Sequence, residues 1–382
     1  MNYRPLGNTG LMVSEIGLGC EGMMEDECRM TRRLLDAAEK NGVNYFDLYS
    51  SNPALHAALG DALEGRRERF YIQAHICSAW IDGQYQRTRV IKQVMEAFEA
   101  LLKNLKTDYV DVGMIHYVDS VEDWQEVMQG GVMQYAQRLK KEGRIRHIGL
   151  SSHNPLVAQK AVDSGLIEVL MFSVNPCYDL LPGSEDCEDL WKDESYGENL
   201  TNMDPDRERL YETCQRLGVG ITVMKAFGGG DLLRADMSPA GVALKVPQCI
   251  HYCLTRPGVA TVLTGAHSVS QLKDALEYET ASDAEKDYAP AFSKMPKISW
   301  AGHCMYCGHC APCVKGISVA DVTKFLNLCR AQGTVPETIR GHYALLPHHA
   351  GECIGCGACE TRCPFDVRIR ENMQAAAELF GM

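Results

Sequence analysis

Two runs of closely spaced cysteines stand near the C-terminus of this 382-residue chain. The first run is Cys304-x2-Cys307-x2-Cys310-x2-Cys313, and the second is Cys353-x2-Cys356-x2-Cys359-x3-Cys363-Pro364. Thiolates at such short intervals hold the irons of a cubic cluster, and the second run matches the bacterial ferredoxin spacing. In that pattern three cysteines ligate one cluster, and the fourth, followed by proline, ligates the other. The runs therefore predict two [4Fe–4S] clusters and a redox protein.

The crossed pattern gives each cluster three ligands from one run and a fourth from the other. The predicted sets are Cys304, Cys307, Cys310 and Cys363 for one cluster, and Cys353, Cys356, Cys359 and Cys313 for the other. The first run departs slightly from the ferredoxin spacing, because Pro312 precedes its last cysteine instead of following it. Zinc is the alternative, since four-cysteine zinc sites also use C-x2-C pairs. Two such pairs suffice for zinc, so the evenly stepped runs favour clusters.

The composition limits where the protein works and what it binds. The hydrophobic fraction of 46% and the charged fraction of 23% are ordinary for a soluble globular protein. No apolar run approaches a membrane span, and the N-terminus does not resemble a signal peptide, so we expect a cytoplasmic protein. A net charge of −12 disfavours nucleic-acid binding, which needs clustered Lys and Arg. In a cytosolic chain, metal binding explains cysteine runs better than disulfides do.

The elements that must position any active site follow a β/α pattern. After a hairpin over residues 3–16, eight short apolar runs alternate with helical stretches, one of which is predicted over residues 239–256. The predicted strands are Ile16–Gly19, Tyr45–Asp47, Phe70–Ala74, Val110–Ile115, His147–Ser151, Val169–Ser173, Gly220–Met224 and Thr261–Thr264. This pattern predicts an α/β fold, a (β/α)8 TIM barrel over residues 1–282, with a small α-helical ferredoxin-like domain over residues 283–382. A doubly wound sheet is the alternative, but Leu18–Met23 matches its glycine fingerprint poorly.

One connection is unusually long. Residues 175–206 contain many acidic side chains and follow the sixth predicted strand. Long connections in a compact domain are often functional. We expect this segment to lie over the barrel mouth as a lid.

Motifs along the whole chain resemble those of the aldo-keto reductases, in the branch with a C-terminal ferredoxin-like extension. They are Leu6-Gly7-Asn8-Thr9-Gly10, Gly17-Leu18-Gly19, Asn44-Tyr45-Phe46-Asp47, Met114-Ile115-His116, Gly149-Leu150-Ser151-Ser152-His153-Asn154, Met224-Lys225-Ala226-Phe227-Gly228-Gly229-Gly230 and the two cysteine runs. Together these motifs are specific for the family fold. The resemblance implies NAD(P)-dependent carbonyl chemistry on an Asp, Tyr, Lys and His tetrad at the ends of strands two, three and four.

Half of that tetrad matches this chain, at Asp47 and His116. The lysine position falls on His75, and the tyrosine position falls on Asn52 unless Tyr49 substitutes for it. Carbonyl reduction needs an acid to protonate the forming alkoxide and a cation to assist that acid. We therefore expect His116 to hydrogen-bond the substrate oxygen, Tyr49 to be the acid, and Asp47 to tune His75. The alternative for Tyr49 is that it only packs.

The resemblance also implies a partial pocket for a nicotinamide cofactor. The residues assigned to it are Ser151, Ser152, Asn154, Lys225, Gly228, Gly229, Gly230 and Gly265. The serines and the asparagine match the stretch that grips the carboxamide, and the glycines would let backbone approach a pyrophosphate. The loop over residues 265–271 lacks the Arg or Lys that would pair with a 2′-phosphate, so NAD is favoured over NADP.

The same strand ends also allow other functions. Asp47, His75, His116 and His153 could gather zinc or iron, which would make the barrel a metal-dependent lyase or hydrolase with accessory clusters. A degenerate barrel that serves only as an electron-transfer subunit is a further alternative. We favour an oxidoreductase that couples a barrel site, acting on a small carbonyl or alcohol, to electron transfer through two clusters. Its redox partner would be a ferredoxin or a flavodoxin.

Overall fold

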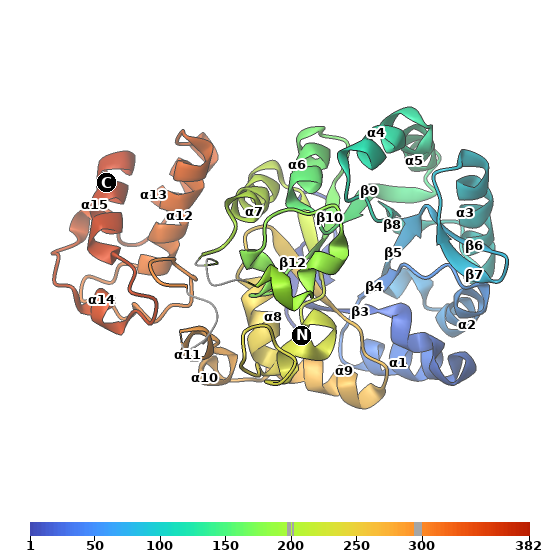
Figure 1. Ribbon diagram of the computed structural model, residues 1–382, viewed down its shortest axis with the longest axis horizontal. Coiled ribbons are helices and arrows are strands. Elements are labelled where there is room, and N and C mark those ends of the chain that lie inside the picture. The colour runs from blue at the N-terminus through green and yellow to red at the C-terminus, as the bar shows by residue number, and fades with distance from the viewer. Residues whose placement is uncertain (197–199, 201, 294–299) are drawn as a thin grey trace.

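The structure is a computed structural model that describes residues 1–196, 200, 202–293 and 300–382 (Figure 1). The chain begins with the expected antiparallel hairpin of β1 (Tyr3–Pro5) and β2 (Met12–Ser14). Gly7 in the turn has a φ of +52°, and a Cβ there would lie 2.2 Å from the carbonyl oxygen of Gly218. Only glycine fits this position, so the turn packs directly against the start of a barrel strand.

Eight parallel strands close into a barrel in the order β10-β11-β12-β3-β4-β5-β8-β9. They are β3 (Ile16–Gly19), β4 (Tyr45–Leu48), β5 (Tyr71–Ile76), β8 (Val110–Ile115), β9 (Ile145–Ser152), β10 (Val169–Ser173), β11 (Gly220–Met224) and β12 (Val259–Thr264). Every residue of β4, β8, β10 and β12 is buried, as expected for parallel strands covered by helices. The predicted TIM barrel is confirmed.

Helices cover the outside of the barrel. They are α1 (Arg29–Lys40), α2 (Pro53–Leu63), α3 (Ile91–Leu105), α4 (Val121–Gln129), α5 (Val132–Lys141), α6 (Pro155–Asp163), α7 (Pro205–Leu217), α8 (Val246–Leu254) and α9 (Val269–Leu276). Three of them begin with an Asn or Asp cap followed by proline, at Asn52, Asn154 and Asp204. Each cap oxygen accepts a backbone N–H of the first turn, and proline there costs no hydrogen bond.

Short 3-10 turns complete the connections of the chain. They span Cys20–Cys28, Arg67–Arg69, Tyr178–Leu180, Cys187–Leu190, Asp193–Ser195, Gly228–Leu233, Glu277–Glu279 and Ala350–Glu352. Three of these turns fall in the long connection after β10, part of which lies outside the described residues.

Two local features differ from the sequence prediction. A helix was expected over residues 239–256, but α8 begins only at Val246, because Gly241 has a φ of +71° and Pro247 occupies the first turn. A second hairpin, β6 (Ser78–Ile81) and β7 (Gln84–Arg87), follows β5 and was not predicted. Its turn residues Asp82 and Gly83 both have positive φ, the geometry of a two-residue hairpin turn.

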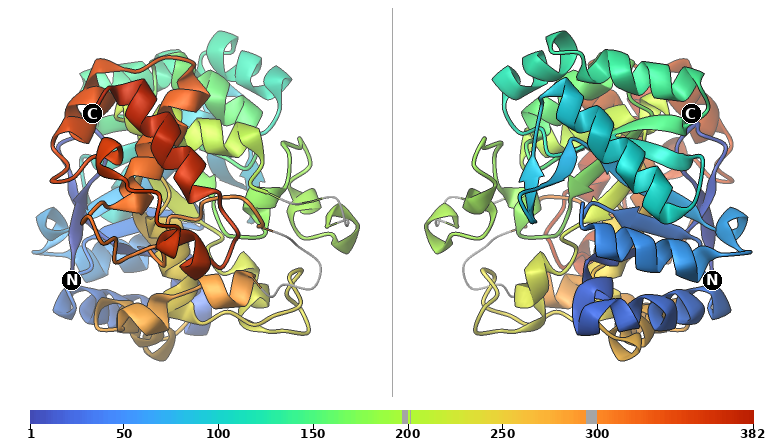
Figure 2. Two further views of the ribbon diagram at one scale, coloured as in Figure 1. Left: turned by 90° about the vertical axis from the view of Figure 1, so that its left-hand side faces the viewer. Right: turned by 90° about the vertical axis from the view of Figure 1, so that its right-hand side faces the viewer.

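The C-terminal region is helical and packs against the barrel (Figures 1 and 2). It contains α10 (Asp283–Lys286), α11 (Ala289–Phe292), α12 (Val319–Gln332), α13 (Glu337–Ala344), α14 (Ala358–Arg362) and α15 (Ile369–Phe380). Arg256, which directly precedes β12, donates from Nη2 to the Met305 carbonyl at 3.0 Å, and the Tyr288 hydroxyl donates to the same oxygen at 2.7 Å. The region therefore docks at the barrel end where the strands begin.

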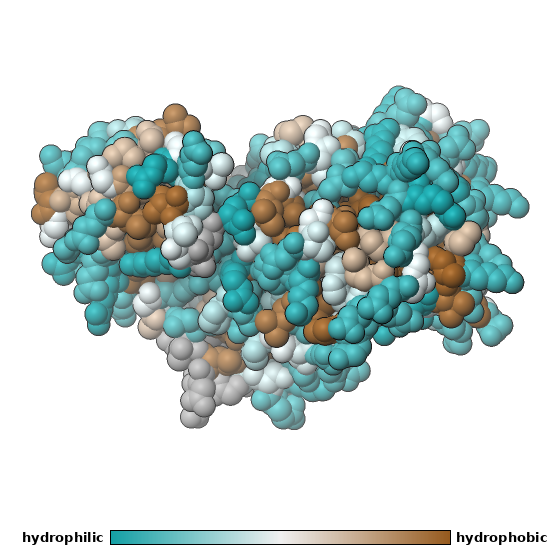
Figure 3. Space-filling model, turned by 90° about the horizontal axis from the view of Figure 1, so that it is seen from above, coloured by the Kyte–Doolittle hydropathy of each residue, from teal (hydrophilic) through white to brown (hydrophobic). Residues whose placement is uncertain are grey.

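The predicted domain boundary at residues 282 and 283 coincides with the start of α10 and stays a prediction. The expected linker over residues 283–297 lies partly outside the described residues. On the face shown in Figure 3 the surface is mostly hydrophilic, and a recess separates the C-terminal region from the barrel. Within the described part of the chain, none of the helices has the length and apolar character needed to cross a membrane.

Candidate active site and cluster sites

The largest candidate site is a cavity of 870 Å³ at the barrel end where the strands finish. In (β/α)8 enzymes this end carries the chemistry. Polar side chains from the ends of β4, β5 and β8 form one part of the wall. The apolar part comes from Met171, Met224, Phe227, Leu233, Val246 and Leu263.

Asp47, His75 and His116 converge in this cavity, as predicted from their places at consecutive strand ends. His75 Nε2 lies 2.9 Å from Asp47 Oδ1, and His75 Nδ1 lies 2.7 Å from His116 Nδ1. Asp47 and His75 are almost completely buried, at 2% and 3% exposure. The three side chains form one hydrogen-bonded row that water barely reaches.

Gln73 fixes the orientation of Asp47 from inside the barrel. Its amide Nε2 donates to Asp47 Oδ1 at 2.6 Å. Its amide oxygen accepts from the Tyr45 hydroxyl at 2.9 Å and from Thr222 Oγ1 at 3.1 Å. Because two hydroxyls hold the oxygen end, the NH2 end must face Asp47, and the carboxylate is held as an acceptor.

Two tyrosines approach His116 in different ways. The Tyr49 ring stacks on the His116 ring with centroids 6.2 Å apart, while its hydroxyl donates to Glu21 Oε1 at 2.7 Å. The Tyr85 hydroxyl, from the β6–β7 hairpin, lies 2.6 Å from His116 Nε2. Tyr49 as the acid stays a prediction, and Tyr85 is a second hydroxyl that the sequence prediction did not include.

Burial dominates the electrostatics of the row. Burial holds the pKa of His116 well below its usual value, and the neighbouring His75 is the second cause of this lowering. Burial raises the pKa of Tyr49, and the bond to Glu21 raises it further. Burial also raises the pKa of Tyr85, but the nearby guanidinium groups of Arg87 and Arg89 oppose that rise. Near neutral pH, His116 is therefore uncharged and both phenols keep their protons.

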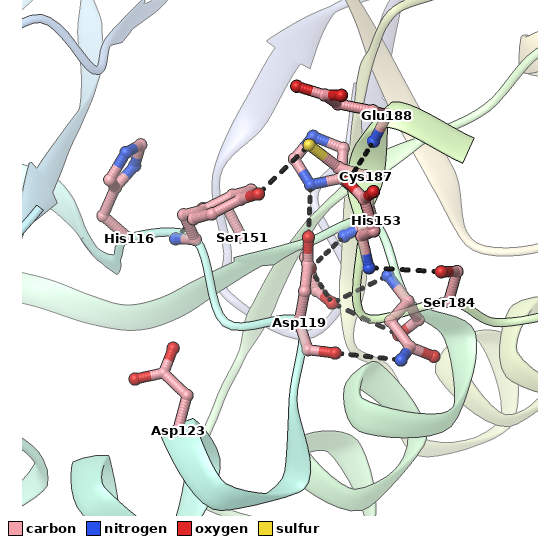
Figure 4. A network of polar contacts seen from close by, with 12 residues as sticks. His116, Asp119, Asp123, Ser151, His153, Ser184, Cys187 and Glu188 are labelled. Atoms are coloured by element: carbon pink, nitrogen blue, oxygen red, sulfur yellow. Dashed lines mark hydrogen bonds and ion pairs between the residues drawn. The ribbon is translucent and has the colours of Figure 1, made fainter. Parts of the chain in front are cut away.

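His153, which was considered as a metal ligand, belongs to a separate network (Figure 4). Its Nδ1 lies 2.8 Å from Asp119 Oδ2, and its backbone N–H donates to Asp119 Oδ1 at 2.6 Å. Burial acts to raise the pKa of Asp119, but the bonds from His153 lower it on balance. In Figure 4, Ser151 lies between this network and His116.

A mononuclear metal would need these histidines to converge on one point. Instead His75 and His116 share a contact between their Nδ1 atoms, and His153 Nδ1 is bound to Asp119. Among the described residues of the barrel mouth, no three His, Cys, Asp or Glu side chains are placed to bind one metal ion. The donor geometry at the barrel mouth is that of a hydrogen-bonded relay.

The expected cofactor residues divide between the cavity wall and the interior. Ser151 lines the cavity, and its Oγ accepts the Tyr117 N–H at 2.8 Å. Ser152 is fully buried and donates to Asp119 Oδ1. Asn154 is buried, caps α6 and donates to the Asp119 carbonyl. Ser152 and Asn154 therefore shape the turn behind the cavity, because Asp119 and the start of α6 occupy their polar atoms.

Three consecutive glycines after β11 have left-handed backbone, with φ of +60°, +75° and +108° at Gly228, Gly229 and Gly230. Gly229 and Gly230 line the cavity with open space where a Cβ would stand, whereas Gly228 faces Leu232. Lys225 also lines the cavity, with its ammonium 5.8 Å from the centre of the Trp191 ring. The Gly228 and Gly230 N–H groups bond to the Lys225 and Phe227 carbonyls, so the open backbone at Gly229 and the Lys225 ammonium are the groups that suit an anionic ligand.

The loop after β12 forms another part of the wall. Gly265, His267 and Gln271 line the cavity, and so does the carboxylate-bearing Asp274 of α9. Lys273, the cation next to Asp274, is exposed and lies outside the cavity wall. The loop therefore presents polar and acidic groups to the cavity.

The described part of the long connection after β10 contacts a residue that lines the cavity, and its role as a lid stays a prediction. Cys187 Sγ accepts the Tyr117 hydroxyl at 3.1 Å, and Tyr117 lines the cavity (Figure 4). Residues 197–199 and 201 of the expected lid lie outside the described residues. Burial raises the pKa of Cys187. The hydrogen bond from Tyr117 lowers it by a smaller amount, so the pKa of Cys187 is raised on balance.

The cysteines of the two runs form two groups. Burial raises the pKa of Cys304 to about 12, and three neighbouring thiols add to the rise; they belong to Cys307, Cys310 and Cys363. A separate pocket is lined by Cys313, Cys353, Cys356 and Cys359. The structure thus brings Cys363 to the first run and Cys313 to the second. The crossed ligand sets stay a prediction.

Tyr85 was missed although the sequence carries a signal for it. Asp-Gly at residues 82 and 83, flanked by residues with β propensity, is a strong indicator of a two-residue hairpin turn. Recognising it would have placed a hairpin directly after the strand that ends near His75. Tyr85 would then have been a candidate for the barrel mouth.

Comparisons with known proteins cover both parts of the chain. A family model described as "Aldo/keto reductase family" matches residues 16–243, and one described as "4Fe-4S binding domain" matches residues 347–369. L-galactose dehydrogenase of Arabidopsis thaliana is 31% identical over 337 residues, which cover 76% of this chain and 95% of that protein. An uncharacterized oxidoreductase, YqkF of Bacillus subtilis, is 27% identical over 298 residues, covering 74% and 92%. The holo structure of aldo-keto reductase AKR11C1 from Bacillus halodurans has the same fold, with a TM-score of 0.59 at 24% identity over 75% of this chain and 94% of that one.

Proposed function

Because the chain belongs to the aldo/keto reductase family and carries a 4Fe–4S binding domain, we propose that it is a nicotinamide-dependent oxidoreductase with two [4Fe–4S] clusters. The proposed substrate is a small carbonyl or alcohol compound bound in the cavity at the barrel mouth. The proposed catalytic groups include Asp47, His75 and His116, which take the place of the usual tetrad.

The observation that carries this proposal is the buried row of Asp47, His75 and His116 beside a cavity large enough for a cofactor and a small substrate. A bound nicotinamide supplies or accepts the hydride in this chemistry. The protein must then move one proton to or from the substrate oxygen, and a hydrogen-bonded imidazole row serves that purpose. Asp47 provides the counter-charge when the row carries an additional proton.

The cavity wall supports a cofactor of the NAD type. Ser151 would hold the carboxamide end, and the open backbone at Gly229 and Gly230 would approach the pyrophosphate, with Lys225 beside it. Gly265 and its loop would border the ribose and adenine. Asp274 favours a free 2′-hydroxyl there and disfavours a 2′-phosphate, because a carboxylate accepts the former and repels the latter.

The two cysteine groups fit iron–sulfur clusters by the chemistry of their donors, since each supplies four thiols from two separate chain segments. Cys304, Cys307, Cys310 and Cys363 would hold one cluster, and Cys313, Cys353, Cys356 and Cys359 would hold the other. Bound clusters would supply one-electron storage. A ferredoxin or flavodoxin is the partner that we propose for exchanging these electrons.

The proposal is tested with anaerobic full-length protein that contains its clusters. We expect NADH to bind and to bleach the visible absorbance of the clusters, faster than NADPH does. Binding without bleaching would separate the barrel chemistry from the clusters. If neither nucleotide binds, the nicotinamide proposal is wrong, and an electron-transfer subunit becomes the better description.

A matched pair of glycine variants checks the proposed binding mode. Gly229→Ala and Gly10→Ala both add a methyl group at left-handed backbone with no heavy atom within 4 Å, so their local strain is comparable. Gly229 lines the cavity, whereas Gly10 lies in the β1–β2 turn at the far end of the barrel. We expect only Gly229→Ala to weaken NADH binding, by roughly tenfold, in a fluorescence titration. Equal effects of the two variants would contradict the placement of the cofactor.

A further inference from the structure

A tyrosine hydroxyl outside the expected tetrad completes a row of four hydrogen-bonded side chains. Tyr85 Oη lies 2.6 Å from His116 Nε2, and the two rings meet edge to face with centroids 5.8 Å apart. From His116 the row continues through His75 to Asp47. Tyr85 is 42% exposed, whereas the other three are at most 9% exposed, and all four line the cavity. The phenol is therefore the member of the row that a substrate can touch.

We propose that Tyr85 is the catalytic residue that exchanges a proton with the substrate oxygen, and that His116, His75 and Asp47 form the relay that restores its proton. This inference rests on the proposed function, because it assigns the acid–base group of that same site. It adds a residue from the β6–β7 hairpin to a set that otherwise comes from the barrel strands.

The row can hold its protons in two orders, because each contact has room for one proton. With an additional proton, His75 donates from Nε2 to Asp47 and from Nδ1 to His116, and His116 donates from Nε2 to the Tyr85 oxygen. The Tyr85 O–H is then available to the substrate. Without that proton, Tyr85 donates to His116 Nε2 and His116 Nδ1 donates to His75, while His75 Nε2 still donates to Asp47.

Carbonyl reduction converts the first order into the second. The carbonyl carbon receives a hydride from the reduced nicotinamide of the proposed function, and its oxygen takes the Tyr85 proton. The Tyr85 oxygen takes the proton of His116 Nε2, and His116 Nδ1 takes that of His75 Nδ1. One hydride and one proton have been added to the substrate, and His75 has changed from a cation beside Asp47 to a neutral imidazole. Alcohol oxidation runs the same transfers in reverse.

The surroundings favour Tyr85 over Tyr49 for this role. The Tyr49 hydroxyl is already committed to Glu21, whose charge disfavours a phenolate. Arg87 and Arg89 follow Tyr85 on and after the same strand, and their charges favour a phenolate there. Both arginines are held near the site by Asp123, at 3.5 Å and 2.6 Å. His153 also acts to lower the pKa of His116.

Hydroxyl deletions test the assignment with NADH and 4-nitrobenzaldehyde as the probe substrate. Tyr85→Phe should lower kcat by roughly a hundredfold to ten-thousandfold, with NADH affinity and iron content unchanged. Tyr135→Phe is the control, because the Tyr135 hydroxyl on α5 has no hydrogen-bond partner among the residues that the structure describes and is not part of the cavity wall. Full activity of Tyr85→Phe would overturn the proposal. Loss in Tyr49→Phe alone would give the acid role to Tyr49.

A second measurement does not depend on turnover. If wild-type protein fails to oxidise NADH with the aldehyde, the proposed function is in error for that substrate, but the relay can still be tested by nitrogen-15 NMR of labelled histidines. With the row neutral, His116 should carry its proton on Nδ1 and His75 on Nε2, and Tyr85→Phe should shift the His116 Nε2 resonance. A proton on His116 Nε2 in the neutral row, or an unshifted resonance, would overturn the relay.

Discussion

Replacing Asp47 by asparagine keeps the shape of the side chain and removes its charge. Asp47 Oδ1 lies 2.9 Å from His75 Nε2 and 2.6 Å from Gln73 Nε2, and an amide oxygen can still accept both bonds. At 2.9 Å a pair of unit charges attracts by roughly 6 kcal/mol at an effective dielectric constant of about 20. Carbonyl reduction starts from the row with the additional proton, which Asp47 stabilises. If solvent and neighbouring dipoles replace about half of this attraction in the variant, that form is disfavoured by about 3 kcal/mol, and turnover falls by roughly a hundredfold.

The assay is the steady-state reduction of 4-nitrobenzaldehyde by NADH, together with a titration of NADH binding. We expect kcat to fall while the dissociation constant of NADH stays the same, because asparagine keeps the shape of the Asp47 side chain and the proposed cofactor contacts lie elsewhere in the wall, at Ser151, Gly229 and Lys225. Asp61→Asn, an exposed carboxylate on α2 that pairs with Lys106, is the control for unspecific loss of charge. Turnover of Asp47→Asn within about threefold of wild type, less than 1 kcal/mol, would refute the electrostatic reasoning.

The other expectations concern the clusters, the nucleotide and the fold. Anaerobic protein should contain about eight irons and about eight acid-labile sulfides per chain, whereas zinc without sulfide would contradict the clusters. Cys363→Ala should damage the cluster of the first cysteine run more than that of the second, as seen by EPR; the reverse would show that the ligands are not crossed. NADH should bind more tightly than NADPH, and Asp274→Ser should narrow this difference in affinity. A calorimetric titration in which NADPH binds more tightly would contradict the proposed place of Asp274 beside the adenosine ribose. Burial, and next Glu208, raise the pKa of Glu212 to about 9, so folding takes up a proton and stability falls as pH rises from about 4.5 toward 9. Glu212→Gln should therefore raise the free energy of unfolding by a few kcal/mol near pH 7.5 and by little at pH 4, and equal gains at both pH values would count against this cause.

The barrel was predictable because its strands leave an unambiguous pattern. The run Val169–Ser173 is apolar on both faces apart from its last residue, and the structure has a strand at those residues. Helix length was harder to predict from local pattern alone. Residues 239–256 look continuously helical in composition, but the left-handed Gly241 delays α8 until Val246. The start of a helix therefore depends on the backbone conformation of a single residue, which the composition of the segment does not reveal.

The candidate site could likewise be predicted only in part. Asp47, His75 and His116 were predicted to meet, because strand ends in a barrel share one rim. The contact between Asp47 and His75 was also expected, whereas the contact between the Nδ1 atoms of His75 and His116 was not, because it depends on how each imidazole ring is oriented. A motif match likewise gives residue positions without side-chain direction.

The β6–β7 hairpin makes the chemistry of the mouth separable from the stability of the barrel. Residues 78–87 form a ribbon that pairs with itself and takes no place in the closed ring of strands. Its tip depends on Asp82 and Gly83, which no barrel strand constrains. Evolution can therefore change the length or the sequence of this hairpin, or replace it, without changing how the side chains inside the barrel pack. A barrel with that arrangement can diversify its reactions while its closed ring of strands stays unchanged.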